Sequence, residues 1–268
     1  MCKKIIRMFL FVLFLSLFGF CTHQLINRYI EAQRQNVQSN QISKIINLVS
    51  DEDIESFSNL NETQISFEQL QKDRDRAKVF ISYQNLKEKN PDYIGWISIP
   101  GTVIDYPVLQ NKDDYDYYLY RNFDKQKSSY GSIYLDAACN INSGKNYVIY
   151  GHHMKDGSMF AALNNYQDQN NFFNQQTIRF DSLYEMGDYQ IIAAFKVSSG
   201  NLGELSSFIS INNKDQFNQF VKFIDSNKFY ETGISYSYAD KFLTLMTCEY
   251  SYRNGRIFIV AKKINQIT

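Results

Sequence analysis

Residues 242–262, FLTLMTCEYSYRNGRIFIVAK, consist of two apolar runs on either side of a polar turn. The pair Asn254-Gly255 is a strong turn signal, so the two runs are expected to form a β-hairpin. The first strand of this hairpin ends at Cys248 and the second begins at Arg256, which places the two residues side by side. A guanidinium beside a cysteine favours the thiolate and can donate hydrogen bonds to a developing oxyanion. The stretch therefore predicts two paired strands with a candidate reactive cysteine at their rim.

Short β-rich runs separated by turn residues come before this hairpin. They cover residues 94–99, 103–109, 131–135, 147–150 and 189–197. Many short strands of this kind indicate a closed or nearly closed β-barrel. Residues 158–166 and 214–230 instead have apolar side chains at helical spacing, and the second segment predicts an amphipathic helix before the last two strands. The expected fold class is mainly β with helices (α+β).

A histidine stands at another predicted strand end. His152 follows Gly151 and the run 147–150, where a strand would leave the sheet at a rim. Cysteine, histidine and arginine together can carry out acyl transfer. The thiolate attacks, the imidazolium protonates the leaving amine and the guanidinium stabilises the tetrahedral oxygen. A lone rim histidine is more often a polar surface residue, so the assignment depends on the combination.

The few cysteines and histidines allow two other uses, a disulfide and a metal site. A disulfide between Cys139 and Cys248 is the alternative to a free catalytic thiol in an exported domain, and Cys139 by itself is expected to be a small buried or loop thiol. Adjacent histidines on a strand point to opposite faces, and His152 and His153 lack the spacing of a zinc site with Asp136 or Asp156. No metal and no other cofactor is expected.

The N-terminus has the pattern of an export signal. Lys3, Lys4 and Arg7 precede the apolar run 8–21, and no acidic residue occurs before Glu31. Residues 5–22 are just long enough to cross a bilayer. The positive flank predicts a cytoplasmic N-terminus and an extracellular remainder, that is, a single-pass protein of the cell membrane. A small-x-small cleavage site is missing, which favours an uncleaved signal-anchor over a removed signal peptide.

The rest of the chain divides by composition. We expect an anchor at residues 1–25, a stalk of helical pieces and linker at 26–75, and a catalytic domain at 76–268. The stretch 50–63 is acidic and rich in Ser and Asn, and a helix over 67–89 is expected to stop at Asn90-Pro91. The 28 basic and 28 acidic residues give no net charge, so a nucleic-acid partner is not expected.

The motifs together resemble the sortases. Residues 244–248, TLMTC, followed by Arg256 at the start of an apolar strand, are similar to the sortase signature. The segment 150–160, YGHHMKDGSMF, resembles class B sortases closely, as do 95–97, 104–108 and 131–136. The resemblance spans about residues 75–268. It implies an eight-stranded sortase β-barrel and a membrane-bound cysteine transpeptidase of monoderm bacteria.

The resemblance also implies a reaction and its residues. Such an enzyme cleaves a C-terminal sorting signal of a surface protein, often an Asn-Pro-x-Thr-like pentapeptide. It forms a thioester on Cys248 and transfers the acyl group to an amine of a peptidoglycan precursor or cross-bridge. His152 would be the general acid/base and Arg256 the oxyanion and substrate stabiliser. Met246 stands where class B members often have Ser, which removes a hydroxyl near the site.

Two positions and two alternative functions stay open. Tyr150 and Glu249 flank the site and are expected to line the substrate groove. Their structural alternatives are a strand-end aromatic that packs on the barrel and an ordinary loop carboxylate. The chain could instead be a pilin-polymerising sortase with a pilin lysine as acceptor, or a non-catalytic membrane-anchored β-barrel binding module.

Overall fold

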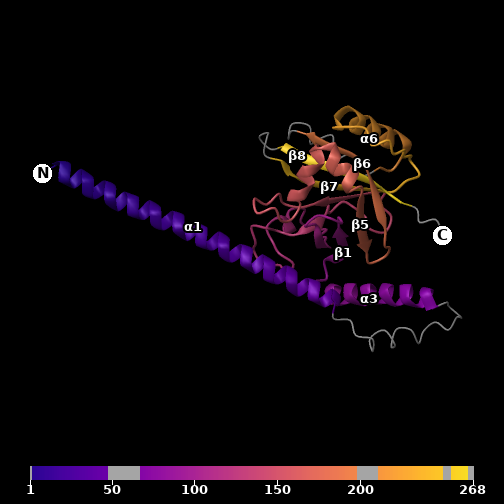
Figure 1. The fold of residues 1–268 in the computed structure, drawn as a ribbon, viewed down its shortest axis with the longest axis horizontal. Coiled ribbons are helices and arrows are strands. Elements are labelled where there is room, and N and C mark those ends of the chain that lie inside the picture. The colour runs from indigo at the N-terminus through magenta and orange to yellow at the C-terminus, as the bar shows by residue number, and fades with distance from the viewer. Residues whose placement is uncertain (1, 48–66, 198–210, 250–254, 265–268) are drawn as a thin grey trace. The chain divides into compact units, whose positions relative to one another are not determined.

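The structure, a computed structural model, describes residues 2–47, 67–197, 211–249 and 255–264 (Figure 1). The chain forms two compact units, Met1–Ile45 and Ile46–Thr268. The linker expected at 50–63 and the hairpin turn at 250–254 lie outside the described residues.

The first unit consists of one helix, α1 (Cys2–Asn47), up to Ile45. Its apolar side chains between positions 8 and 20 are largely exposed: Phe9, Phe14 and Phe20 are 68%, 65% and 61% exposed. The helix is long and apolar enough to cross a membrane. It continues without a break past residue 25, where the sequence predicts the end of the anchor, so the division at 25 and 26 stays a prediction.

The second unit contains a closed eight-stranded β-barrel, as expected from the resemblance. The strands are β1 (Tyr93–Ser98), β2 (Asp105–Leu109), β3 (Ile133–Leu135), β4 (Asn146–Tyr150), β5 (Thr177–Ser182), β6 (Asp188–Val197), β7 (Phe242–Glu249) and β8 (Gly255–Lys263). Around the barrel they follow the order β1-β2-β3-β4-β7-β8-β6-β5. The β2/β3 and β4/β7 pairs are parallel and the others are antiparallel.

Seven of these strands match runs that the residues predict, and β5 does not. Its sequence, TIRFDS, offers only Ile178 and Phe180 as apolar residues, with Arg179 between them. Both apolar side chains are buried in the barrel. A segment with two inward-facing residues is too short for its alternation to stand out from a polar loop.

In the sequence, one helix of this unit precedes the first strand and the others occur between strands. They are α3 (Phe67–Lys89), η1 (Tyr117–Leu119), η2 (Ala161–Gln167), α4 (Gln169–Asn174) and α6 (Lys214–Asn227). The helix α3 agrees with the prediction and runs across position 75, so the domain boundary at 75 and 76 also stays a prediction. The helical spacing at 158–166 corresponds mainly to the 3-10 helix η2.

The amphipathic helix expected before the last two strands is α6, which lies beside β6 (Figure 1). The side chain of Asn213 caps its N-terminus by accepting a hydrogen bond from the Gln216 amide at 2.9 Å. Its apolar face packs on the barrel, with the ring of Phe220 at 5.3 Å from the ring of Phe242. Met246, which is itself partly buried, packs against the buried apolar cluster that contains Phe220 and Phe242.

An ion-pair cluster, Glu185–Lys241–Lys263, joins the start of β7 to the end of β8. The Glu185 carboxylate lies 3.1 Å from Nζ of Lys241 and 2.7 Å from Nζ of Lys263. Partial burial alone would raise the pKa of this carboxyl, but the hydrogen bonds and charges of the two lysines outweigh it and lower the pKa. The cluster therefore favours an ionised Glu185 in the folded protein.

Candidate active site

The predicted site residues come to one end of three neighbouring strands. In the β7/β8 hairpin, Cys248 pairs with Arg256. This is the juxtaposition expected from a first strand that ends at Cys248 and a second that begins at Arg256. On its other side, β7 pairs in parallel with β4 up to Tyr150 and Met246.

The chain beyond β4 stays bound to β7. The Gly151 amide donates to the Met246 carbonyl at 3.2 Å, and Oγ1 of Thr247 donates to the Gly151 carbonyl at 2.8 Å. These two bonds extend the β4/β7 alignment by one residue. They place Gly151 beside Thr247, so His152 and Cys248 are the next residues of the two neighbouring segments, and Cys248 in turn pairs with Arg256.

The backbone of Cys248 and Glu249 belongs to β7, and Glu249 pairs with Gly255. The side chains of Cys248 and Glu249 lie outside the described residues. For both residues the structure therefore gives a place in the strand register, and their roles stay predictions.

His152 is half-buried, and its ring makes a specific contact with the backbone. Its Nε2 lies 2.7 Å from the carbonyl oxygen of Leu119. Because a carbonyl oxygen only accepts, Nε2 is the nitrogen that carries hydrogen in this arrangement. The lone pair of the neutral ring is then on Nδ1, which can take up and release a proton. The ring of Tyr120 also lies beside the imidazole, at 6.2 Å between centroids.

Sequence reasoning missed both of these neighbours. The contact with Leu119 uses a main-chain oxygen, so the identity of its side chain gives no signal. Tyr120 belongs to the tyrosine-rich segment 115–120, where composition alone does not distinguish it from Tyr115, Tyr117 and Tyr118.

His153 lies in different surroundings. It forms a bridge with Met159 and lines an open pocket of about 450 Å³ together with Thr102, Lys155 and Asn164. The two adjacent histidines thus contact different parts of the domain. The assignment of His152 as the general acid/base stays a prediction.

Arg256 is half-buried and is paired on both sides, with Cys248 of β7 and Val197 of β6. Its Nη1 donates to the carbonyl of Gly255 at 3.0 Å. A guanidinium has five N–H donors, and this contact uses one of them.

Tyr150 directs its hydroxyl towards the neighbouring strand. The hydroxyl donates to Oδ2 of Asp136 at 2.6 Å, and the ring packs against Tyr134 with 5.3 Å between centroids. Burial, followed by the charge of Asp136, raises the pKa of the phenol well above its usual value. This geometry matches the strand-end packing alternative, while a role of Tyr150 in substrate binding stays a prediction.

Cys139 is a buried free thiol, as the sequence predicts for this residue by itself. Its Sγ lies 3.5 Å from the Asn146 carbonyl and 3.5 Å from the Val148 amide, and burial raises its pKa to about 12. Val148 is level with Thr244 of β7, four residues before Cys248. At about 3.3 Å per residue, Cys248 lies about 13 Å further along β7 than the level of Cys139, which is well beyond the reach of a disulfide. The alternative of a Cys139–Cys248 disulfide is therefore wrong.

Comparison with known proteins gives a consistent result. Residues 97–264 match the Sortase domain family. The chain therefore belongs to the sortase family. A relative named sortase B in Listeria monocytogenes is 35% identical over 187 residues, covering 68% of this chain and 74% of the relative.

Solved structures show the same similarity. The sortase B of Clostridium perfringens is 36% identical with a TM-score of 0.63, covering 68% of this chain and 99% of that chain. A sortase B–substrate complex of Staphylococcus aureus is 29% identical with a TM-score of 0.65, covering 81% of this chain and 100% of that chain. These relatives place the chain with the class B sortases, which are cysteine transpeptidases.

Proposed function

We propose that this chain is a membrane-anchored class B sortase that attaches surface proteins to the cell wall, with Cys248 as nucleophile, His152 as general acid/base and Arg256 as oxyanion stabiliser. The observation that supports it best is that these three positions lie at the same end of β4, β7 and β8. Residues that are far apart in the sequence are brought to one rim by this register.

The reaction follows from the chemistry of the three groups. The thiolate of Cys248 attacks the carbonyl carbon of the scissile peptide bond, and the guanidinium of Arg256 stabilises the oxyanion that forms. The C–N bond then breaks as the His152 imidazolium gives its proton to the leaving amine, which leaves a thioester on Cys248. An acceptor amine attacks the thioester and gives a proton to His152, the C–S bond breaks, and the thiolate is restored.

The partners follow from the family. The donor is the sorting signal of a surface protein, and an Asn-Pro-x-Thr-like pentapeptide is the first motif to test. The acceptor is an amine of a peptidoglycan precursor or cross-bridge. Tyr150 and Glu249 are proposed to line the groove for the donor. Their positions at the ends of β4 and β7 support this, although the Tyr150 hydroxyl is bonded to Asp136.

The helix α1 is proposed to anchor the enzyme in the cell membrane. Its exposed apolar run has the length and composition of a single span, and the basic residues before the run favour a cytoplasmic N-terminus. In this arrangement residues 1–25 form the anchor, 26–75 the stalk and 76–268 an extracellular catalytic domain.

Peptide cleavage by the full chain in detergent micelles tests the proposal. Peptides are screened for a mass increase on Cys248 that corresponds to a thioester. Cys248→Ala should abolish both adduct and cleavage, and His152→Ala should reduce cleavage severely. The matched control His153→Ala should stay largely active, because His153 lines the open pocket formed with Thr102, Lys155 and Asn164. Severe loss in His153→Ala with an active His152→Ala would overturn the assignment.

Arg256 is tested by a conservative change. Arg256→Lys keeps the positive charge but replaces the planar fork of the guanidinium by a single ammonium, so activity should fall strongly. An Arg256→Lys protein with full activity would contradict the proposed role.

A further inference from the structure

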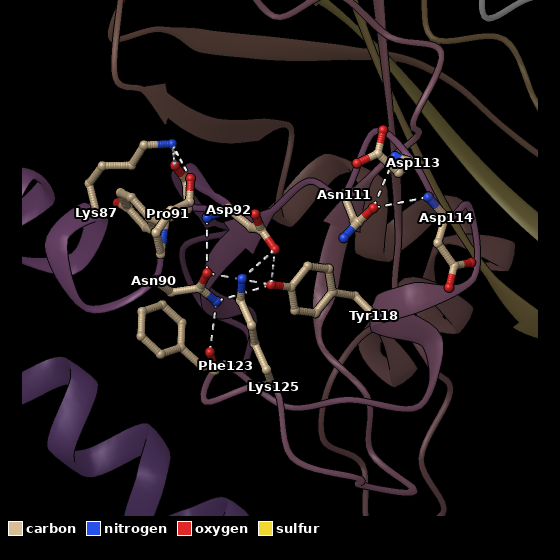
Figure 2. A network of polar contacts seen from close by, with 11 residues as sticks. Lys87, Asn90, Pro91, Asp92, Asn111, Asp113, Asp114, Tyr118, Phe123 and Lys125 are labelled. Carbon is tan, nitrogen blue, oxygen red and sulfur yellow. Dashed lines mark hydrogen bonds and ion pairs between the residues drawn. The ribbon is translucent and has the colours of Figure 1, made fainter.

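A network of polar groups at the start of the barrel holds the segment that contacts His152 (Figure 2). Its centre is Tyr118, which directly precedes Leu119. The side chain of Tyr118 is only 1% exposed. The Tyr118 hydroxyl donates to Oδ2 of Asp92 at 2.7 Å and accepts from Nδ2 of Asn90 at 3.1 Å. The side chain of Tyr118, the residue directly before Leu119, is therefore fixed at its hydroxyl by two hydrogen bonds.

The partners of Tyr118 are fixed in turn. Nδ2 of Asn90 also donates to the Phe123 carbonyl at 2.7 Å, and Oδ1 of Asn90 accepts from the Asp92 amide at 2.9 Å. Nζ of Lys125 lies 3.0 Å from Oδ2 of Asp92. Because Asn90 directly follows α3 and Asp92 directly precedes β1, the network ties Tyr118 to the junction of a helix and a barrel strand.

The backbone on both sides of Leu119 is held from the opposite direction. The carbonyls of Tyr118 and Tyr120 accept hydrogen bonds from amides of the turn 128–132 at 2.9 and 3.0 Å. The Leu119 carbonyl itself packs on Gly131, where an added Cβ would lie 2.5 Å from its oxygen. Gly131 also has a φ of +57°, which favours glycine. The direction of the Leu119 carbonyl is thus set by both sides.

We propose that Tyr118 is a positioning residue for His152. By fixing η1, it holds the Leu119 carbonyl where it accepts the hydrogen bond from Nε2 of His152. This bond sets both the orientation of the ring and the tautomer with a lone pair on Nδ1. The inference rests on the proposed function, in which His152 transfers the proton.

Loss of the Tyr118 hydroxyl would let the Leu119 carbonyl shift, and the ring would then populate other orientations and the other tautomer. Tyr118 is buried and is not expected to touch the peptide. The effect should therefore fall on kcat and leave KM nearly unchanged. A displacement of about 1 Å at a reacting group can cost up to about 100-fold in rate, and a partial loss of alignment should cost about tenfold.

The test compares Tyr118→Phe with Tyr147→Phe in the full chain in detergent micelles. Tyr147 is also 1% exposed, and its hydroxyl donates to the Ile141 carbonyl at 2.9 Å. The control therefore removes the same buried hydroxyl group, but at the start of β4, whereas His152 follows the end of β4. Selective ¹⁵N labelling of histidine reports the ring nitrogens directly, because the chain has only 3 histidines. Tyr118→Phe should lower kcat about tenfold and reduce the Nε2–H tautomer of His152. Tyr147→Phe should change neither.

A second pair of variants uses the acceptor of the same bond. Asp92→Asn keeps an oxygen that can accept from Tyr118 and should retain most of the activity, whereas Asp92→Ala should behave like Tyr118→Phe. Unchanged kcat and tautomer in Tyr118→Phe, or an equal loss in Tyr147→Phe, would overturn the proposal. If His152→Ala stays active while Tyr118→Phe still shifts the tautomer, the proton-transfer role of His152 fails and the positioning contact stands.

Discussion

The hydrogen bond between Thr247 and Gly151 should couple the position of His152 to the strand that ends at Cys248. Thr247→Val removes the hydroxyl but keeps a β-branched side chain that suits a strand. Thr247 is 2% exposed, and the 2.8 Å bond that it donates is the shorter of the two that hold residue 151 on β7. The longer one, from the Gly151 amide to the Met246 carbonyl at 3.2 Å, remains in the variant.

The size of the effect follows from the energy of one such bond. A typical net hydrogen bond contributes about 0.5–1.5 kcal/mol. This energy favours the aligned position of the segment, so its loss lowers the equilibrium constant between aligned and displaced positions by about 2- to 12-fold. We therefore expect kcat for a sorting-signal peptide to fall, by up to about 12-fold, while the free energy of unfolding falls by about 0.5–1.5 kcal/mol.

Thr244→Val is the matched control on the same strand. Thr244 is 4% exposed and its hydroxyl donates to Oδ1 of Asn146, a fully buried residue of β4, at 3.0 Å. This bond also joins β7 to β4 but lies away from the rim. Because its acceptor Asn146 is fully buried whereas Gly151 is half-buried, loss of the Thr244 bond should cost more stability, about 1–3 kcal/mol, and leave kcat unchanged.

The two variants should therefore separate stability from activity. Cleavage of a fluorogenic peptide gives kcat. Urea titration followed by the fluorescence of Trp96, the single tryptophan of the chain, gives the free energy of unfolding. Wild-type kcat in Thr247→Val, or an equal loss of kcat in Thr244→Val, would refute the reasoning that this bond aligns the site.

Glu185→Gln should lower the free energy of unfolding at pH 7 by about 0.5–1 kcal/mol, because it removes the charge that pairs with two lysines. Since the folded-state pKa of Glu185 is lowered, this difference is present above about pH 4.5 and is lost as the pH falls through the folded value, and urea titrations at pH 7 and pH 3 check it. An undiminished difference at pH 3 would contradict the assignment. Cys139, whose pKa is raised to about 12, should resist iodoacetamide at pH 8 in the folded protein and react after denaturation, as peptide mapping would show. Gly95→Ala should destabilise the barrel by about 1–3 kcal/mol, because an added Cβ would lie 2.3 Å from the Asp181 carbonyl oxygen, and an unchanged urea midpoint would count against this.

The parts of the fold that could be predicted from the sequence are those fixed by local patterns. The β7/β8 hairpin follows from two apolar runs and an Asn-Gly turn, and its register places Cys248 opposite Arg256 as expected. The helix α6 follows from apolar residues at helical spacing. The strand β5 lacks such a pattern, because only Ile178 and Phe180 of its side chains point inwards as apolar groups.

The surroundings of His152 could not be predicted in the same way. Its ring contacts a main-chain oxygen of Leu119, and the direction of that carbonyl depends on Tyr118 and on the glycine at 131. These groups meet only when η1, the turn 128–132 and the end of β4 come together. No residue type or spacing in the sequence indicates such a tertiary contact. The sequence therefore predicts His152 but not the groups that orient its ring.

The parallel pairing of β4 with β7 explains how the positions of His152, Cys248 and Arg256 come together. Parallel strands end at the same edge of a sheet, so the chain leaves β4 at Gly151 next to the end of β7. The antiparallel strand β8 begins at that same edge, which adds Arg256. A parallel pair also needs a long connection, and here it contains β5, β6 and α6. The rim is therefore assembled by tertiary pairing across this connection. It follows that substitutions which loosen the β4/β7 contact near residue 151 should impair catalysis before they unfold the barrel.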